Sequence, residues 1–171
     1  MDIDFERSNG IAFIKLDGNV TADNCMEVRD MIMESLTVNK RFLLDLSKVD
    51  YMDSVSVGTF MSLAREVSFM DGDIRFTRPH KTLKSTFKCV RADEVLSLYD
   101  TLKDALIDYY LQDNCEELVQ VERFSDFKSD LFNEFRFNSW YSKTVPSWLR
   151  DDGKDENYRH GLVAKLDHQH S

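Results

Sequence analysis

The sequence has little of several features that define common protein classes. Its three cysteines, Cys25, Cys89 and Cys115, are odd in number and form no CxxC pair, which argues against a disulfide framework and predicts reduced thiols. No stretch approaches the roughly 18 consecutive apolar residues that a transmembrane helix needs. The first ten residues, MDIDFERSNG, are charged where a signal peptide would be apolar. We therefore expect a cytoplasmic protein without membrane insertion.

Positive charge is also scarce. The 171 residues carry 22 Lys and Arg against 31 Asp and Glu, a net charge of −9. A general nucleic-acid binder needs a basic surface to displace counterions, so nucleic acid is not an expected partner. A hydrophobic content of 42% with 12% aromatics is ample for a packed core. The length fits one domain with an appendage, or one larger domain.

The signatures of common catalytic sites are missing. The chain contains no GxGxxG, GxxxxGK[ST], HExxH or GxSxG motif. His168 and His170 form a His-x-His pair, but in a polar C-terminal end such a pair is usually an accident of composition. We therefore expect no enzymatic activity, no metal and no cofactor.

Short apolar runs alternate with helical patterns over the first 112 residues. Residues 3–7 and 11–16 are strand-like and flank a Ser-Asn-Gly turn, which predicts a β-hairpin. Residues 41–46 predict a buried central strand, and residues 74–77 another strand. A helix is predicted between the hairpin and the strand at residues 41–46, capped by Thr21 or Asp23. Its expected inward residues are Cys25, Val28, Ile32 and Leu36.

Three further helices are predicted from apolar spacing. One follows residue 53 and ends at Gly72, another opens at Pro79, and the last is capped by Thr101. The alternation favours an α/β domain with helices packed on a mixed sheet, closing near residue 112. The expected inward residues are Val57, Phe60, Met61, Ala64 and Val67, then Leu83, Phe87 and Val90, and finally Leu102, Ala105, Leu106 and Tyr109.

Residues 113–171 form an extension of different character. They are too rich in aromatic residues for a solvated tail, and the spacing of Phe124, Phe127, Leu131 and Phe135 predicts an amphipathic helix within 116–137. Beyond about residue 146 the chain is polar and is expected to be loose. The extension is therefore predicted to be mainly helical and to bury its aromatics on the domain or on a second copy, as a homodimer. Those aromatics are Phe124, Phe127, Phe132, Phe135, Phe137, Trp140, Tyr141, Trp148 and Tyr158.

An acid and two hydroxyls lie where a strand exit meets a helix, in "YMDSVSVGTFMSLAREV" at residues 51–67. Asp53, Ser54 and Ser56 are suited to capping, because their oxygens accept hydrogen bonds from the free N–H groups of a first turn. A serine at a helix N-terminus is also a favourable place for a phosphate. Both interpretations stay open on spacing alone.

Basic residues recur at helical spacing in one segment of this acidic chain: Lys81, Lys84, Lys88 and Arg91. The plain interpretation is a solvated helix face. The functional interpretation is a docking stripe for an acidic partner, centred on Lys84 and Lys88.

The order of the predicted elements resembles the STAS domain of bacterial anti-sigma factor antagonists. Two motifs carry the resemblance, and they are separated by the distance expected for that family: "LLDLSKVDYMDSVSVGTFMSLAREV" and "ADEVLSLYDTLKDAL". The resemblance covers residues 1–112. It implies a regulatory phosphorylation site at Ser54, preceded by the acid Asp53. Family members usually continue with a second hydroxyl and a glycine. Here Val55 and Ser56 follow, and Gly58 matches the later glycine, so Ser56 is a secondary candidate.

The resemblance implies a signalling protein that takes part in transcription regulation by partner switching. Its expected partners are an anti-sigma factor that doubles as a serine kinase, and a metal-dependent serine phosphatase. The anti-sigma factor is expected to bind when Ser54 is unmodified, through Asp53, Ser54, Ser56 and Gly58. The alternative is a STAS subunit of a transport or scaffold assembly that binds constitutively, without a phosphorylation cycle.

Overall fold

The structure, a computed structural model, describes residues 1–113 and 126–150. The chain consists of two compact units, Met1–Asp100 and Thr101–Ser171. The elements in chain order are β1 (Asp2–Ser8), β2 (Ile11–Asp17), α1 (Cys25–Ser35), β3 (Arg41–Lys48), α2 (Ser54–Phe69), β4 (Asp73–Thr77), α3 (Lys81–Cys89), the 3-10 helix η1 (Ala92–Glu94), β5 (Ser97–Tyr99), α4 (Leu102–Asp113) and α6 (Asp126–Thr144).

The first unit is built on a five-stranded mixed sheet in the order β1-β2-β3-β4-β5. β1 and β2 form the predicted antiparallel hairpin, and the remaining neighbours pair in parallel. Asn9 and Gly10, at the hairpin turn, both have positive φ angles, as a two-residue turn that matches strand twist requires. Each parallel pair is connected by a helix, so the expected α/β fold with a mixed sheet is confirmed.

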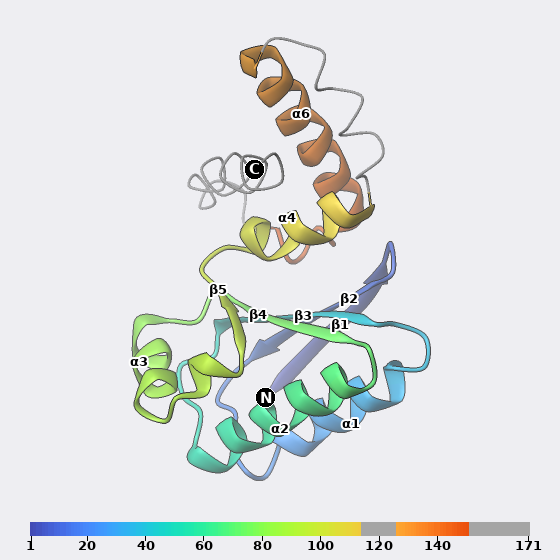
Figure 1. Cartoon of the computed structure of the whole chain (residues 1–171). Helices are drawn as coiled ribbons and strands as arrows, with labels where there is room; N and C mark the ends of the chain where they lie inside the picture. The colour runs from blue at the N-terminus through green and yellow to red at the C-terminus, as the bar shows by residue number, and fades with distance from the viewer. Residues whose placement is uncertain (114–125, 151–171) are drawn as a thin grey trace. The chain divides into compact units, whose positions relative to one another are not determined.

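Helices α1 and α2 lie side by side across one face of the sheet (Figure 1). Their apolar stripes and the strand residues that point to the same face form one core cluster. β3 is buried from Phe42 to Leu46, as predicted for a central strand. The inward side of α2 consists of Val57, Phe60, Leu63 and Val67, while Met61 and Ala64, which were predicted inward, are only partly buried.

Two details of the helix ends differ from the prediction. α1 begins one residue after Asn24, not at Thr21 or Asp23, because the Asn24 side chain accepts a hydrogen bond from the Thr21 N–H (2.9 Å) and closes a turn before the helix. Val90 is exposed, not inward, because α3 ends at Cys89 and Val90 is its C-cap.

The second unit contains α4 and α6. Thr101 caps α4 as predicted, since its hydroxyl accepts a hydrogen bond from the Asp104 N–H (3.0 Å). The ring of Tyr110 on α4 packs against Phe137 (5.3 Å between centroids) and Trp140 (5.4 Å) of α6. Burial raises the pKa of the Tyr110 hydroxyl.

The helix predicted within 116–137 begins at Asp126 and continues to Thr144. Phe135 is exposed, contrary to its predicted inward position, whereas Phe137 and Tyr141 are buried. The predicted domain boundary after residue 112 stays a prediction about which segment folds by itself. Several predicted features lie outside the residues or side chains that the structure describes: Cys115, Phe124, Phe127, Leu131, Phe132, Tyr158, His168, His170 and the loose polar end.

Candidate functional site

The segment that enters α2 is held against the loop between β2 and α1. After β3 ends, Met52 forms an isolated parallel bridge with Val20. The Val20 N–H donates to the Tyr51 carbonyl (3.0 Å), and the Asp53 N–H donates to the Val20 carbonyl (3.3 Å). These bonds join two loops that are far apart in sequence, and they fix where α2 begins.

Asp53 is the N-cap of α2, and both of its carboxylate oxygens accept hydrogen bonds. Oδ1 accepts from the Ser56 N–H (2.8 Å) and from the Ser56 hydroxyl (2.7 Å), while Oδ2 accepts from the Ala22 N–H (2.8 Å). These hydrogen bonds lower the pKa of Asp53 because they favour the carboxylate. The largest effect comes from the Ser56 N–H, followed by the Ser56 hydroxyl and then the Ala22 N–H. Asp53 is thus a clamp between the two loops as well as a cap.

The two candidate serines have opposite environments. Ser54, the first residue of α2, is exposed. Ser56 is 0% exposed, and its hydroxyl is committed to Asp53. A kinase needs a hydroxyl that can enter its own active site, so only Ser54 offers one without local unfolding.

The surroundings of Ser54 favour an added negative charge and close approach. Beyond the Asp53 cap, which is itself a carboxylate, the first turn of α2 carries no acidic residue, and a helix N-terminus is equivalent to about half a positive charge. One turn further along, Gly58 is exposed, and a Cβ atom built there would meet no other atom within 4 Å. Val55 and Tyr51 are exposed large side chains on either side of Ser54 in sequence.

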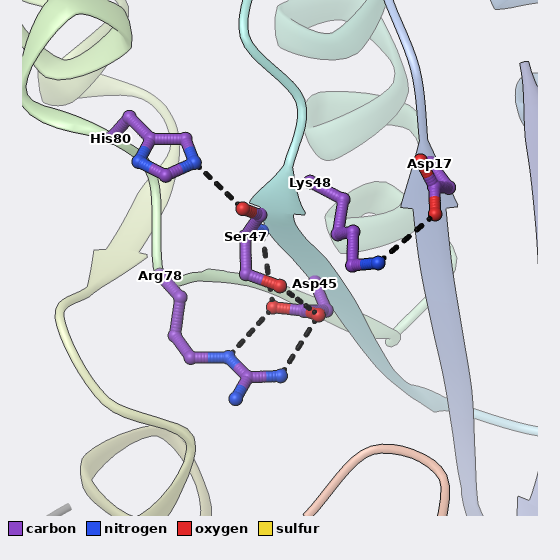
Figure 2. A network of polar contacts seen from close by, with 6 residues as sticks. All are labelled: Asp17, Asp45, Ser47, Lys48, Arg78 and His80. Atoms are coloured by element: carbon purple, nitrogen blue, oxygen red, sulfur yellow. Dashed lines mark hydrogen bonds and ion pairs between the residues drawn. The ribbon is translucent and has the colours of Figure 1, made fainter. Parts of the chain in front are cut away.

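A second polar cluster lies at the carboxyl ends of β3 and β4 (Figure 2). Arg78 binds the Asp45 carboxylate through two hydrogen bonds, from Nε and Nη2, each of 2.9 Å. The Ser47 hydroxyl donates to the other side of that carboxylate (2.7 Å), and His80 Nε2 contacts the Ser47 carbonyl (2.7 Å). The cluster holds the end of β3, from which the chain continues to α2.

This cluster does not have the geometry of a nucleophile and its base. His80 contacts the backbone carbonyl of Ser47, and a carbonyl only accepts, so Nε2 must carry the proton. The Ser47 hydroxyl points instead to Asp45 (Figure 2). Within the described part of the chain, no group of three or more His, Cys, Asp or Glu side chains is placed to hold a metal ion.

The basic residues predicted as a docking stripe lie on and after α3, a different element from the helix that carries Ser54. Lys84 forms an ion pair with Asp100, so part of its charge is compensated within the unit. Lys88 is exposed in the last turn of α3, and Arg91 follows that helix with a positive φ angle. Lys88 is therefore the more available cation of the central pair.

Sequence reasoning missed the partners that position the site. Ala22, Asp45 and Arg78 come from other segments, and the pairs Ala22–Asp53 and Asp45–Arg78 are separated by 31 and 33 residues. Asp45 was visible as an acid within an apolar strand, which is a signal of a buried ion pair. Neither Ala22, which acts through its backbone, nor Arg78 had such a signal.

The sheet topology and the acid-capped helix that follows its central strand define a small α/β module with an anion-favouring helix N-terminus. A family model described as the STAS domain matches residues 2–105. The chain therefore belongs to the STAS domain family. None of the helices that the structure describes combines the length and the apolar character needed to cross a bilayer.

Known proteins that resemble the chain carry related names. A Thermotoga neapolitana protein named as a candidate anti-sigma factor antagonist homologue is 29% identical over 66 residues, which are 39% of this chain and 58% of that protein. The chain thus spans less than two thirds of the length of this relative. The crystal structure of a candidate anti-sigma factor antagonist of Thermotoga maritima has a TM-score of 0.57 at 17% identity, covering 62% of this chain and 92% of that one.

The structure of the anti-sigma factor antagonist SpoIIAA in its unphosphorylated form has a TM-score of 0.51 at 18% identity, covering 64% of this chain and 97% of that one. SpoIIAA of Bacillus also has a structure in its phosphorylated form, with a TM-score of 0.50 and 18% identity, covering 61% of this chain and 96% of that one. At these identities the structures establish the fold that they share with the chain. That shared fold is the STAS fold.

Proposed function

We propose that this chain is a non-enzymatic partner-switching regulator, an anti-sigma factor antagonist or a relative of one, that is controlled by reversible phosphorylation of Ser54. Its partner is an anti-sigma factor that is also the serine kinase, and a metal-dependent phosphatase removes the phosphate. One observation carries the proposal: Ser54 is an exposed hydroxyl at the N-terminus of a capped helix, while its neighbour Ser56 is buried.

The site can accept a phosphate without damage to the fold. Transfer of a phosphoryl group to the Ser54 oxygen adds about −1.5 to −2 charges. At a helix N-terminus this charge is favoured by about 0.3–1 kcal/mol, a gain that repulsion from the neighbouring Asp53 carboxylate reduces. The hydroxyl of Ser54 contributes no capping bond, since Asp53 and Ser56 form the cap. Modification of Ser54 therefore leaves the cap in place.

The same charge is unfavourable in an interface. A charge that is buried without a partner costs about 3–5 kcal/mol. Because each 1.4 kcal/mol is a tenfold change in affinity, the complex weakens by about two decades or more. Phosphorylation thus dissociates the complex while the folded chain persists.

The decisive experiment compares three chains incubated with the cognate kinase: wild type, Ser54→Ala and Ser56→Ala. We expect intact-mass spectra to show one added phosphoryl group on wild type and on Ser56→Ala, and none on Ser54→Ala. Ser54→Asp should bind the kinase more weakly than Ser54→Ala, with a partial effect because a carboxylate carries less charge than a phosphate. Phosphate on Ser56 with Ser54 untouched would contradict the assignment.

The competing function is a STAS subunit of a transport or scaffold assembly that binds constitutively. The departure at Val55 and Ser56 from the usual family pattern favours it. The two functions differ in one measurable property, the presence of phosphoserine in chain isolated from its native cell. Unmodified chain under all growth conditions, together with a partner that stays bound, would support the constitutive subunit.

A further inference from the structure

One face of α2 stays uncovered in the first unit along its whole length. Ser54, Gly58, Ser62, Arg65 and Phe69 follow one another at intervals of three or four residues, so they lie on one helix face, and all five are exposed. At 1.5 Å per residue the face extends about 22 Å from Ser54 to Phe69. Its first half consists of small residues, which allow a partner to approach the helix closely.

The far end of this face contains a groove. Its volume is about 350 Å³, and it is lined by Ala64, Arg65, Ser68, Phe69 and Val95. These residues define the Phe69 groove. The Phe69 side chain is 91% exposed, although burying a phenylalanine ring is favourable by about 1.5–3 kcal/mol. This exposed ring next to a hollow is the observation from which an interaction site is argued.

The charge of the groove specifies the kind of partner. Arg65 is exposed, and in the described part of the chain it forms no ion pair, in contrast to Arg29, which pairs with Glu66 (2.8 Å). No carboxylate is among the lining residues. On a chain of net charge −9, this is an unusual site at which an acidic side chain of a partner is attracted.

We propose that the Phe69 groove docks an amphipathic helix of the partner that also binds the Ser54 surface, with an apolar side chain against Phe69 and a carboxylate at Arg65. Helix-in-groove recognition uses this combination of an apolar anchor and a flanking charge. The identity of the partner rests on the proposed function, whereas the chemistry of the docked helix rests on the groove.

The distance along α2 separates the groove from the phosphate. Arg65 is eleven residues after Ser54, which is about 16 Å along the helix and about twice the Debye length of about 8 Å at physiological salt, so charge added at Ser54 is largely screened at Arg65. The groove contact should therefore persist when Ser54 is phosphorylated. It would leave the partner a residual, weaker affinity after phosphorylation has removed the Ser54 contact.

A second copy of the chain and a membrane fit the groove less well. A two-fold symmetric contact places the same patch on both sides, so the groove of one copy would offer no lining carboxylate to Arg65 of the other. An anionic membrane would repel a chain of net charge −9.

The test begins with a photo-crosslinking amino acid placed at Phe69 of the full chain in its native cell, with the same probe at Val38 as a control. Val38 is a matched site because it is 71% exposed and is not among the groove residues. We expect the Phe69 probe to label one heterologous protein, and peptide mapping to place the crosslink in an amphipathic segment that contains Asp or Glu. Labelling of another copy of this chain, of lipid, or of nothing above the Val38 background would overturn the inference.

The labelled protein is then purified, and its binding to immobilised full chains is measured by surface plasmon resonance. Phe69→Ala should weaken affinity at least tenfold, about 1.4 kcal/mol, and Val38→Ala should leave it unchanged. Phe69→Ala should reduce the affinity by the same factor in a chain that carries Ser54→Asp as in the wild-type chain. Equal affinity of Phe69→Ala and wild type would overturn the inference. If the labelled protein needs Phe69 but cannot phosphorylate Ser54, the groove stands and the phosphorylation proposal fails.

Discussion

Removal of Arg78 should destabilise the first unit more than most surface changes, because its partner is buried. The Asp45 side chain is 0% exposed and that of Arg78 is 13% exposed, and two bonds of 2.9 Å join them. In Arg78→Met, the Asp45 carboxylate would keep only its bonds from Ser47. Breaking a buried pair by removing one partner costs about 3–5 kcal/mol. We therefore expect a loss of about that size in the free energy of unfolding.

The control is the double variant Asp45→Leu with Arg78→Met, which removes both charges. Replacing a buried ion pair by apolar residues is often neutral or stabilising by about 1–4 kcal/mol, so the double variant should be more stable than Arg78→Met alone. Urea unfolding followed by far-UV circular dichroism measures both, with the slope of the transition compared to check that the same surface unfolds. A loss below about 1 kcal/mol in Arg78→Met, or no recovery in the double variant, would refute this reasoning.

Two further predictions concern the cap and the basic stripe. The bonds from Ser56 hold the pKa of Asp53 in the folded chain below its value in the unfolded chain. The ionised Asp53 therefore stabilises the fold at pH values above the unfolded-state pKa, and this stabilisation is lost as the pH falls through the folded-state pKa. Urea titrations should show Asp53→Ala less stable than wild type at neutral pH, with the difference shrinking in acid; a constant difference would contradict the role of the charge. Reversing Lys84 and Lys88 to Glu should slow association with the acidic partner and reduce its salt dependence, with the larger share from Lys88, since Lys84 is paired with Asp100. Association rates measured at several salt concentrations check this, and unchanged rates would make these residues a solvated face.

Features that depend on neighbouring residues were predictable from the sequence. The turn at Asn9 and Gly10 produced the hairpin, and the hydroxyl of Thr101 caps α4. α2 ends at Phe69, three residues before the predicted Gly72, whose N–H binds the Val67 carbonyl (2.9 Å) and where a Cβ atom would come within 2.8 Å of the Val67 side chain. In each case the interaction reaches only a few residues along the chain, so the local pattern contains the information.

The helix ends and faces were less predictable, because they depend on competing local bonds and on where the core lies. Asn24 takes the place of the predicted caps through a bond within its own turn. Phe135 has the helical spacing of an inward residue but is exposed. Spacing predicts that a helix has an apolar face, yet only packing decides which residues of that face are covered.

The sequence by itself determined that Asp53, Ser54 and Ser56 meet at the start of a helix after a buried strand. Only the tertiary structure decided that Ser54 is exposed while Ser56 is buried against Asp53. Two residues further along a helix correspond to a rotation of about 200°, so the contrast depends on which side of α2 faces the sheet. That side is set by the bonds of Val20 and Ala22 to the segment before the helix, from a loop about thirty residues earlier. The residue pattern near α2 does not predict these contacts, because they form only when the parallel strands bring both loops to the same edge of the sheet.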